Sequence, residues 1–171
     1  KKAAGKGGFL TNEDTNKVNV MAAYTRDNYH LSATYTTQHG NFGAFNYYST
    51  DKVKGSSDLT GYALRAWFRP DETGTAVPSV SVGLDVADFN DKPLGFQNGN
   101  GYSIAFNWQD MFQADDVIGI AFGQPIKGTD NTTATTKDVD PFLWEAYYSF
   151  RPNDSIAVSY THLTLPTKRI V

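Results

Sequence analysis

The amino-acid sequence predicts an all-β protein in which about eight antiparallel strands follow one another up and down in chain order. Three observations support this prediction. Apolar and polar residues alternate along eight segments, as they do where successive side chains point to opposite faces of a strand. The connections between these segments alternate between short and long. No apolar run approaches the roughly 18 to 20 residues that a membrane-spanning helix needs.

The first four predicted strands each have one apolar face and are bounded by residues that favour turns. Arg26-Asp27-Asn28 separates the first two strands, and Pro70 opens the turn after the third. The opposite faces carry polar or small residues. The strands and their apolar residues are 17–25 with Val18, Val20, Ala22 and Tyr24; 29–38 with Tyr29, Leu31, Ala33 and Tyr35; 60–69 with Tyr62, Leu64, Ala66 and Phe68; and 79–87 with Val80, Val82, Leu84 and Val86.

The last four predicted strands repeat the pattern with more aromatic residues. The clearest turn is 151–154, where Pro152 presets φ, and Asn153 and Asp154 can hydrogen-bond their own backbone. The strands and their apolar residues are 101–109 with Tyr102, Ile104, Phe106 and Trp108; 117–123 with Ile118, Ile120 and Phe122; 142–150 with Phe142, Trp144, Ala146, Tyr148 and Phe150; and 155–160 with Ile156, Val158 and Tyr160.

The connection lengths favour a transmembrane β-barrel over a soluble sandwich. Short periplasmic turns and long outer loops alternate in an up-and-down barrel, whereas Greek-key crossings give no reason for that alternation. The predicted short connections are 26–28, 70–77, 110–116 and 151–154, and the long ones are 39–59, 88–100 and 124–140.

Charged residues in the middle of strands also favour a barrel over a soluble sandwich. Arg65, Asp85 and Glu145 lie on the polar faces, where an unpaired charge in a dry core would cost several kcal/mol and a water-filled lumen removes that cost. The alternative is that these faces are the solvent-exposed outside of a soluble sheet.

Composition narrows the function classes. The 171 residues contain no Cys, which excludes a disulfide framework and a Cys-based zinc site. A net charge of -3 argues against a nucleic-acid partner, which a basic surface would attract. The polar, Gly-rich start of the chain shows no apolar segment typical of a signal peptide.

Two sets of residues are candidates for function. Four charged residues are predicted to line a pore, where charge sets ion and solute preference; the alternative is that they only hydrate the wall or pair across strands. Five aromatic residues near strand ends are predicted to form interfacial girdles, with ordinary core packing as the alternative. The pore-lining candidates are Arg65, Arg69, Asp85 and Glu145, and the girdle candidates are Tyr29, Tyr102, Trp108, Phe142 and Trp144.

The sequence indicates no catalytic or metal site. His30, His39 and His162 are scattered and lack metal-ligand spacing, and no nucleophile elbow accompanies the Ser, His and Asp residues. We therefore expect no metal, no cofactor and no enzymatic activity, and an enzyme on a barrel scaffold ranks last among the hypotheses.

Three stretches resemble a known family. RAWFRPDETGTAVPSVSVGLD (65–85), NWQDMFQADDVIGIAFGQP (107–125) and DVDPFLWEAYYSFRPNDSIAV (138–158) are similar to the barrel of cyanobacterial outer-membrane porins, the OprB-like carbohydrate-selective family often labelled iron uptake porins. The resemblance implies a barrel of about sixteen strands, of which this chain supplies a C-terminal portion of about eight, roughly half. It also implies a homotrimer as the full-length protein.

The end of the chain departs from that family. VSYTHLTLPTKRIV (158–171) resembles a tail that recurs on unrelated translations read from adapter sequence, and Pro166 does not suit a ladder strand. We therefore expect a porin-barrel fragment over residues 1–158 and a non-native tail over 159–171.

These observations lead to one expected function and one alternative. The expected function is passive diffusion of small hydrophilic solutes, carbohydrates or inorganic ions, through the cell outer membrane, with membrane lipid as the surrounding partner. The alternative is a soluble β-sandwich that binds carbohydrate through exposed Tyr and Trp side chains.

Overall fold

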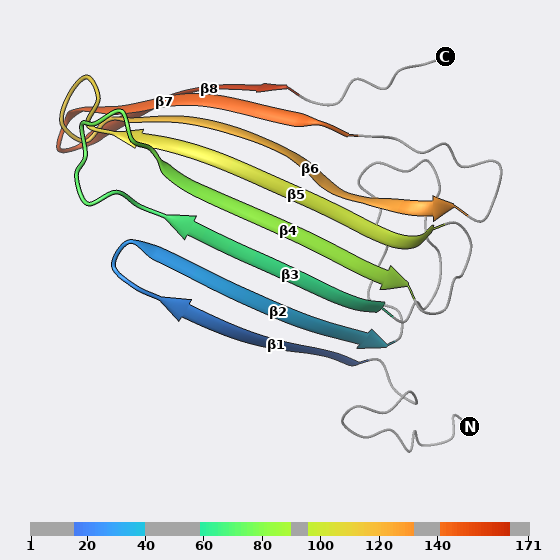
Figure 1. Cartoon of the computed structure of the whole chain (residues 1–171). Helices are drawn as coiled ribbons and strands as arrows, with labels where there is room; N and C mark the ends of the chain where they lie inside the picture. Colours follow the sequence, from blue (N-terminus) through green and yellow to red (C-terminus); the bar gives the residue numbers. More distant parts are fainter. Residues whose placement is uncertain (1–15, 40–58, 90–95, 132–140, 165–171) are drawn as a thin grey trace, which may run out of the picture.

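The computed structural model describes residues 16–39, 59–89, 96–131 and 141–164. These residues form one sheet of eight strands in the order of the sequence, and every neighbouring pair is antiparallel (Figure 1). The predicted all-β, antiparallel, up-and-down fold class is therefore confirmed. The strands are β1 (Asn16–Thr25), β2 (Tyr29–His39), β3 (Leu59–Phe68), β4 (Ser79–Phe89), β5 (Phe96–Gln109), β6 (Val117–Asn131), β7 (Leu143–Asn153) and β8 (Ile156–Thr164).

The strand register places the apolar residues of neighbouring strands side by side on one face, here called the apolar face. Because paired residues in a ladder point the same way, one row of partners can be followed across the whole sheet. That row is Tyr24, Leu31, Ala66, Val82, Ile104, Phe122, Trp144 and Thr164. The adjacent row on the opposite face, here called the polar face, is Ala23, Ser32, Arg65, Gly83, Ser103, Gly123 and Leu143.

On β3 and β4, burial is inverted relative to a water-soluble sheet. On the apolar face Leu64, Leu84 and Val86 are 48%, 52% and 55% exposed. Two hydrophobic residues, Leu59 and Ala87, are buried on the polar face, at 6% and 4% exposure. Within the described part of the chain, no second layer of structure covers the apolar face.

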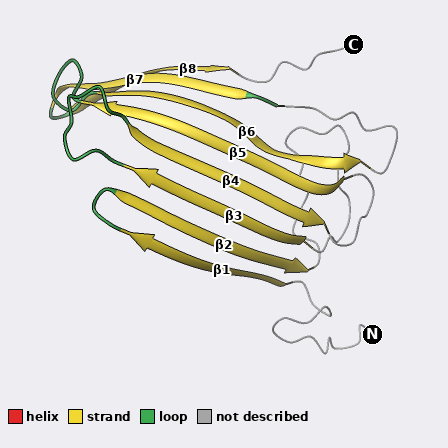
Figure 2. Ribbon diagram, viewed as in Figure 1, coloured by secondary structure: helices red, strands yellow, loops and turns green. Residues whose placement is uncertain are grey.

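The described turns lie together at one end of the sheet (Figure 2). The turn between β5 and β6 is organised by Asp116, whose side chain is fully buried. Its carboxylate accepts hydrogen bonds from the amides of Met111 (2.8 Å), Phe112 (3.0 Å) and Gln113 (3.2 Å), and from the Tyr148 hydroxyl (3.1 Å). Burial by itself raises the pKa of Asp116, but these hydrogen bonds outweigh it and hold the pKa below its usual value.

The structure moves several predicted strand boundaries. β7 continues to Asn153, so the turn predicted at 151–154 begins only at Asp154. β5 begins at Phe96 and β6 continues to Asn131, so parts of the predicted loops 88–100 and 124–140 are strand. Sequence alternation failed there because ladder hydrogen bonds need only backbone, and the paired side chains are Asn, Gly, Lys and Thr. The register shift between Asn100 and Tyr102 accommodates Pro125, which has no N–H to give to a regular ladder.

β8 continues to Thr164, beyond the predicted strand end at 160, and pairs with β7 along this length. Residues 165–171 lie outside the described ranges, as does most of the predicted long connection 39–59. In the part of the chain that the structure describes, no helix is long and apolar enough to cross a membrane.

Candidate functional site: the polar face

The polar face of the sheet is hollowed in several places. Three hollows are lined mainly by polar-face residues, near Glu145, near Asn107 and near Gln38. Side chains converge on the concave side of a curved sheet, which explains why the polar face is the more buried of the two. We therefore take this face as the candidate functional site.

Two of the four predicted charged residues meet. Arg65 on β3 and Asp85 on β4 form an ion pair in which one guanidinium nitrogen, Nη2, donates to both carboxylate oxygens, at 2.7 and 2.9 Å. Arg65 also donates to the backbone carbonyls of Leu64 and Leu84, both at 2.9 Å. The guanidinium lies beside Gly83, where a Cβ would come within 3.3 Å of the Arg65 side chain. The Arg65 side chain therefore lies flat against the polar face of the sheet, and the Asp85 carboxylate neutralises its charge.

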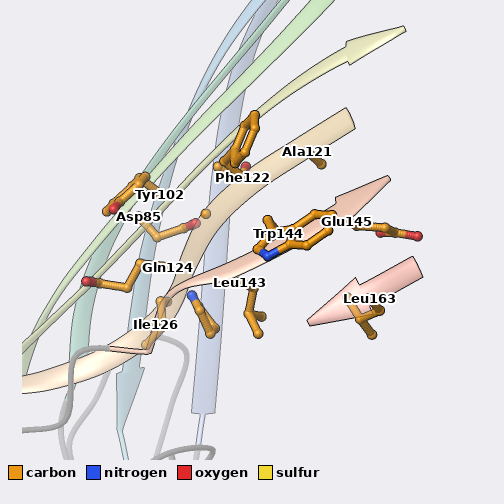
Figure 3. Close-up of a pocket in the computed structure, with 13 residues that line it drawn as sticks. Asp85, Tyr102, Ala121, Phe122, Gln124, Ile126, Leu143, Trp144, Glu145 and Leu163 are labelled. Carbon is orange, nitrogen blue, oxygen red and sulfur yellow. The ribbon is translucent and has the colours of Figure 1, made fainter. Parts of the chain in front are cut away.

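Glu145 on β7 lies apart from that pair but shares a hollow with Asp85. This hollow is also lined by Leu143 and by Leu163 of β8 (Figure 3). Glu145 is partly buried, and no cation among the described residues forms an ion pair with it. The hollow therefore carries one neutralised and one unneutralised carboxylate.

Arg69, the fourth candidate, follows β3 directly at the turn end. Its backbone N–H donates to the Asn28 carbonyl at 2.7 Å, and the Asn28 side-chain amide donates to the Arg69 carbonyl at 3.1 Å. The guanidinium lies 5.4 Å from the ring centroid of Trp67. Trp67 in turn stacks on His30 at 5.9 Å, and His30 contacts the Thr25 hydroxyl at 2.8 Å. This series of contacts holds a cation at the turn end of the polar face.

Tyr147 is a wall residue that the sequence patterns did not single out. Its hydroxyl donates to the Asn107 side-chain oxygen at 2.6 Å, although β6 runs between their two strands. The ring lies across Gly119 of β6, and a Cβ at that position would overlap the ring. Strict alternation correctly places Tyr147 on the polar side of its strand with Glu145, but it gives no sign of the contact across β6.

Four of the five predicted girdle residues lie near an end of the apolar face. Tyr29 and Trp108 lie at the turn end, and Trp108 donates its indole N–H to the Ala76 carbonyl at 3.0 Å. Phe142 and Trp144 lie at the opposite end, where β7 begins, whereas Tyr102 is in the middle of β5, paired with Leu84. Tyr29, Tyr102 and Phe142 are 46%, 44% and 51% exposed.

Other aromatic residues, which the prediction omitted, extend both groups. Tyr24 lies 6.0 Å from Tyr29, and Tyr35 lies 5.5 Å from Tyr62, between ring centroids. Their positions could be assigned only once the strand registers were known.

The described residues contain no group of three or more His, Asp or Glu side chains that could hold a metal ion. His30 and His162 each contact an aromatic ring instead, those of Trp67 and Trp144. Comparisons of the chain with protein-family models, with curated proteins and with solved structures find no match.

Proposed function

We propose that this chain is part of an outer-membrane β-barrel that conducts small hydrophilic solutes, with the polar face lining the channel and the apolar face in contact with lipid. The channel is a porin of the kind that the sequence resemblance implies, and it performs no catalysis. The permeating solutes in this proposal are carbohydrates or inorganic ions.

The observation that carries the proposal is the inverted burial of the two faces. In water, leaving Leu64, Leu84 and Val86 half exposed forgoes the hydrophobic stabilisation that a soluble fold needs. In lipid the same exposure has no cost, because hydrocarbon surrounds the side chains. A polar, concave opposite face is what a water-filled lumen requires.

The aromatic residues support the same orientation. On β5, Tyr102 and Trp108 bracket Ile104, and about 20 Å of strand separates them at about 3.3 Å per residue. On β3, Tyr62 and Phe68 bracket Leu64 in the same way. Two aromatic belts around an aliphatic band are typical of the lipid-facing surface of a barrel.

The edges of the sheet indicate what else the channel needs. Within the described residues, β1 and β8 each pair on one side only. Unpaired backbone groups are not tolerated in hydrocarbon. We therefore propose that further strands complete the barrel, and that these 171 residues alone do not form a stable pore.

Conductance in planar bilayers tests the proposal. The full-length protein that contains this sheet should insert from detergent and give discrete, ohmic steps. A preparation that is folded by circular dichroism yet gives no channels would overturn the proposal. A full-length protein that remains in the soluble fraction without detergent would favour the alternative, a soluble carbohydrate-binding sheet.

A further inference from the structure

We propose that the polar face holds a binding site for a small inorganic oxyanion, such as phosphate, at the turn end of the sheet, with Arg69 as its cation. This inference rests on the proposed channel in one respect, that the polar face meets water and solute. It adds a chemical class of ligand and a place at which that ligand binds.

The charge of the hollow carries the inference. Arg69 is the only charged side chain among the described residues that line it, and it is solvent-exposed. The rest of the lining includes the hydroxyls of Ser79 and Ser81 and the side-chain amides of Asn107 and Gln109. One cation with several uncharged donors and no carboxylate is a set that recognises an oxyanion.

The cation is held in place before any ligand arrives. The main chain of Arg69 is tied to Asn28 by two hydrogen bonds, and its guanidinium lies over Trp67. Among the described residues, no carboxylate forms an ion pair with it, whereas Arg65 is neutralised by Asp85. A planar guanidinium that is ordered and unpaired presents its fork of N–H donors to a ligand.

The amide of Asn107 is oriented as well. Because the Tyr147 hydroxyl donates to the Asn107 side-chain oxygen, the amide nitrogen remains to donate elsewhere. The hollow has a volume of about 390 Å³, and both Asn107 and Arg69 line it. Arg69 also lines an adjoining hollow together with Glu72, but Glu72 forms no ion pair with it among the described residues and is solvent-exposed, so water screens its charge.

The hollow shared by Asp85 and Glu145 makes an internal contrast. Its one charge without a partner is the Glu145 carboxylate, because Asp85 is paired with Arg65, so this hollow disfavours anions. An anion that enters the channel is therefore expected to reside at the Arg69 end, rather than along the whole wall.

Phosphate block of potassium chloride current through the full-length protein tests the site. Phosphate should reduce the wild-type current with a half-blocking concentration that rises about ten-fold or more in Arg69→Gln, because a charge-assisted contact is lost. Asn107→Asp, which adds a carboxylate to the hollow, should raise the half-blocking phosphate concentration by a similar factor. Arg26→Gln is the matched control, since Arg26 also lies 5.4 Å from an aromatic ring, Tyr24, but does not line the hollow.

The outcomes separate this inference from the proposed function. Channels whose phosphate block is unchanged in Arg69→Gln, or changed equally in Arg26→Gln, would overturn the oxyanion site and leave the porin standing. If wild-type protein gives no channels, phosphate binding in detergent is measured by titration calorimetry. Binding that Arg69→Gln abolishes would support the site without the channel, and absence of binding would overturn it.

Discussion

Leu84 provides the sharpest test of which solvent the apolar face meets. It lies in the middle of this face, between Leu64 on β3 and Tyr102 on β5, and is 52% exposed. If the face contacts lipid, Leu84→Lys puts an ammonium into hydrocarbon and should cost about 2 to 4 kcal/mol. If the face contacts water, the same substitution at a half-exposed position should stay within about 0.5 kcal/mol.

Equilibrium urea unfolding of the full-length protein in phosphatidylcholine vesicles, followed by tryptophan fluorescence, measures this difference. Ser81→Lys is the control, because Ser81 is exposed on the polar face of the same strand. It should change the free energy of unfolding by no more than about 0.5 kcal/mol. Equal effects of Leu84→Lys and Ser81→Lys would refute the assignment of the apolar face to lipid.

Three further predictions concern the wall and one turn. Asp85→Asn should destabilise the protein by about 1 kcal/mol, because the Arg65 guanidinium loses its partner, and Arg65→Met in the same chain should recover part of that loss in a double-mutant cycle. Gly119→Val should cost about 1 to 3 kcal/mol in chemical unfolding, since its side chain displaces the Tyr147 ring; a cost no larger than at an exposed strand position would contradict the packing described. The pKa of Asp116 in the folded protein is below its usual 3.8, so the ionised carboxylate stabilises the fold above about pH 4, and this stabilisation is lost as the pH falls through the folded-state pKa. Asp116→Asn should remove this acid dependence of the free energy of unfolding. An unchanged pH profile of unfolding in the variant would contradict the role given to Asp116.

The strands and their two faces could be predicted because strand side chains alternate with a period of two. In β3 and β4 the predicted apolar sets, including Leu64 and Leu84, all lie on the apolar face. The charged candidates Arg65 and Asp85 are on the polar face, and pairing across strands was one expected alternative for them, but which residues would pair could not be predicted. It depends on the register between two strands that a turn of unknown geometry connects.

Other features left no periodic signal. The extensions of β5 and β6 beyond the apolar band consist mostly of polar and Gly residues, a composition that is typical of loops. The Tyr147 side chain can cross β6 and hydrogen-bond to Asn107 only because the β6 residue between them, Gly119, has no side chain. Only the aligned registers of three strands reveal this arrangement.

The glycines link the curvature of the sheet to its proposed function. Glycine is a poor strand residue, so its restriction to one face needs a physical reason. A Cβ would come within 2.9 Å of Ser103 at Gly83 and within 2.6 Å of the Tyr102 carbonyl at Gly123. Crowding on the concave face therefore favours glycine there, and it lets Arg65 and Tyr147 lie flat rather than fill the hollow. The apolar face carries no glycine within the described strands, as expected where side chains must shield the backbone from lipid. The glycines of the described strands, all on the polar face, are Gly61, Gly83, Gly99, Gly101, Gly119, Gly123 and Gly128.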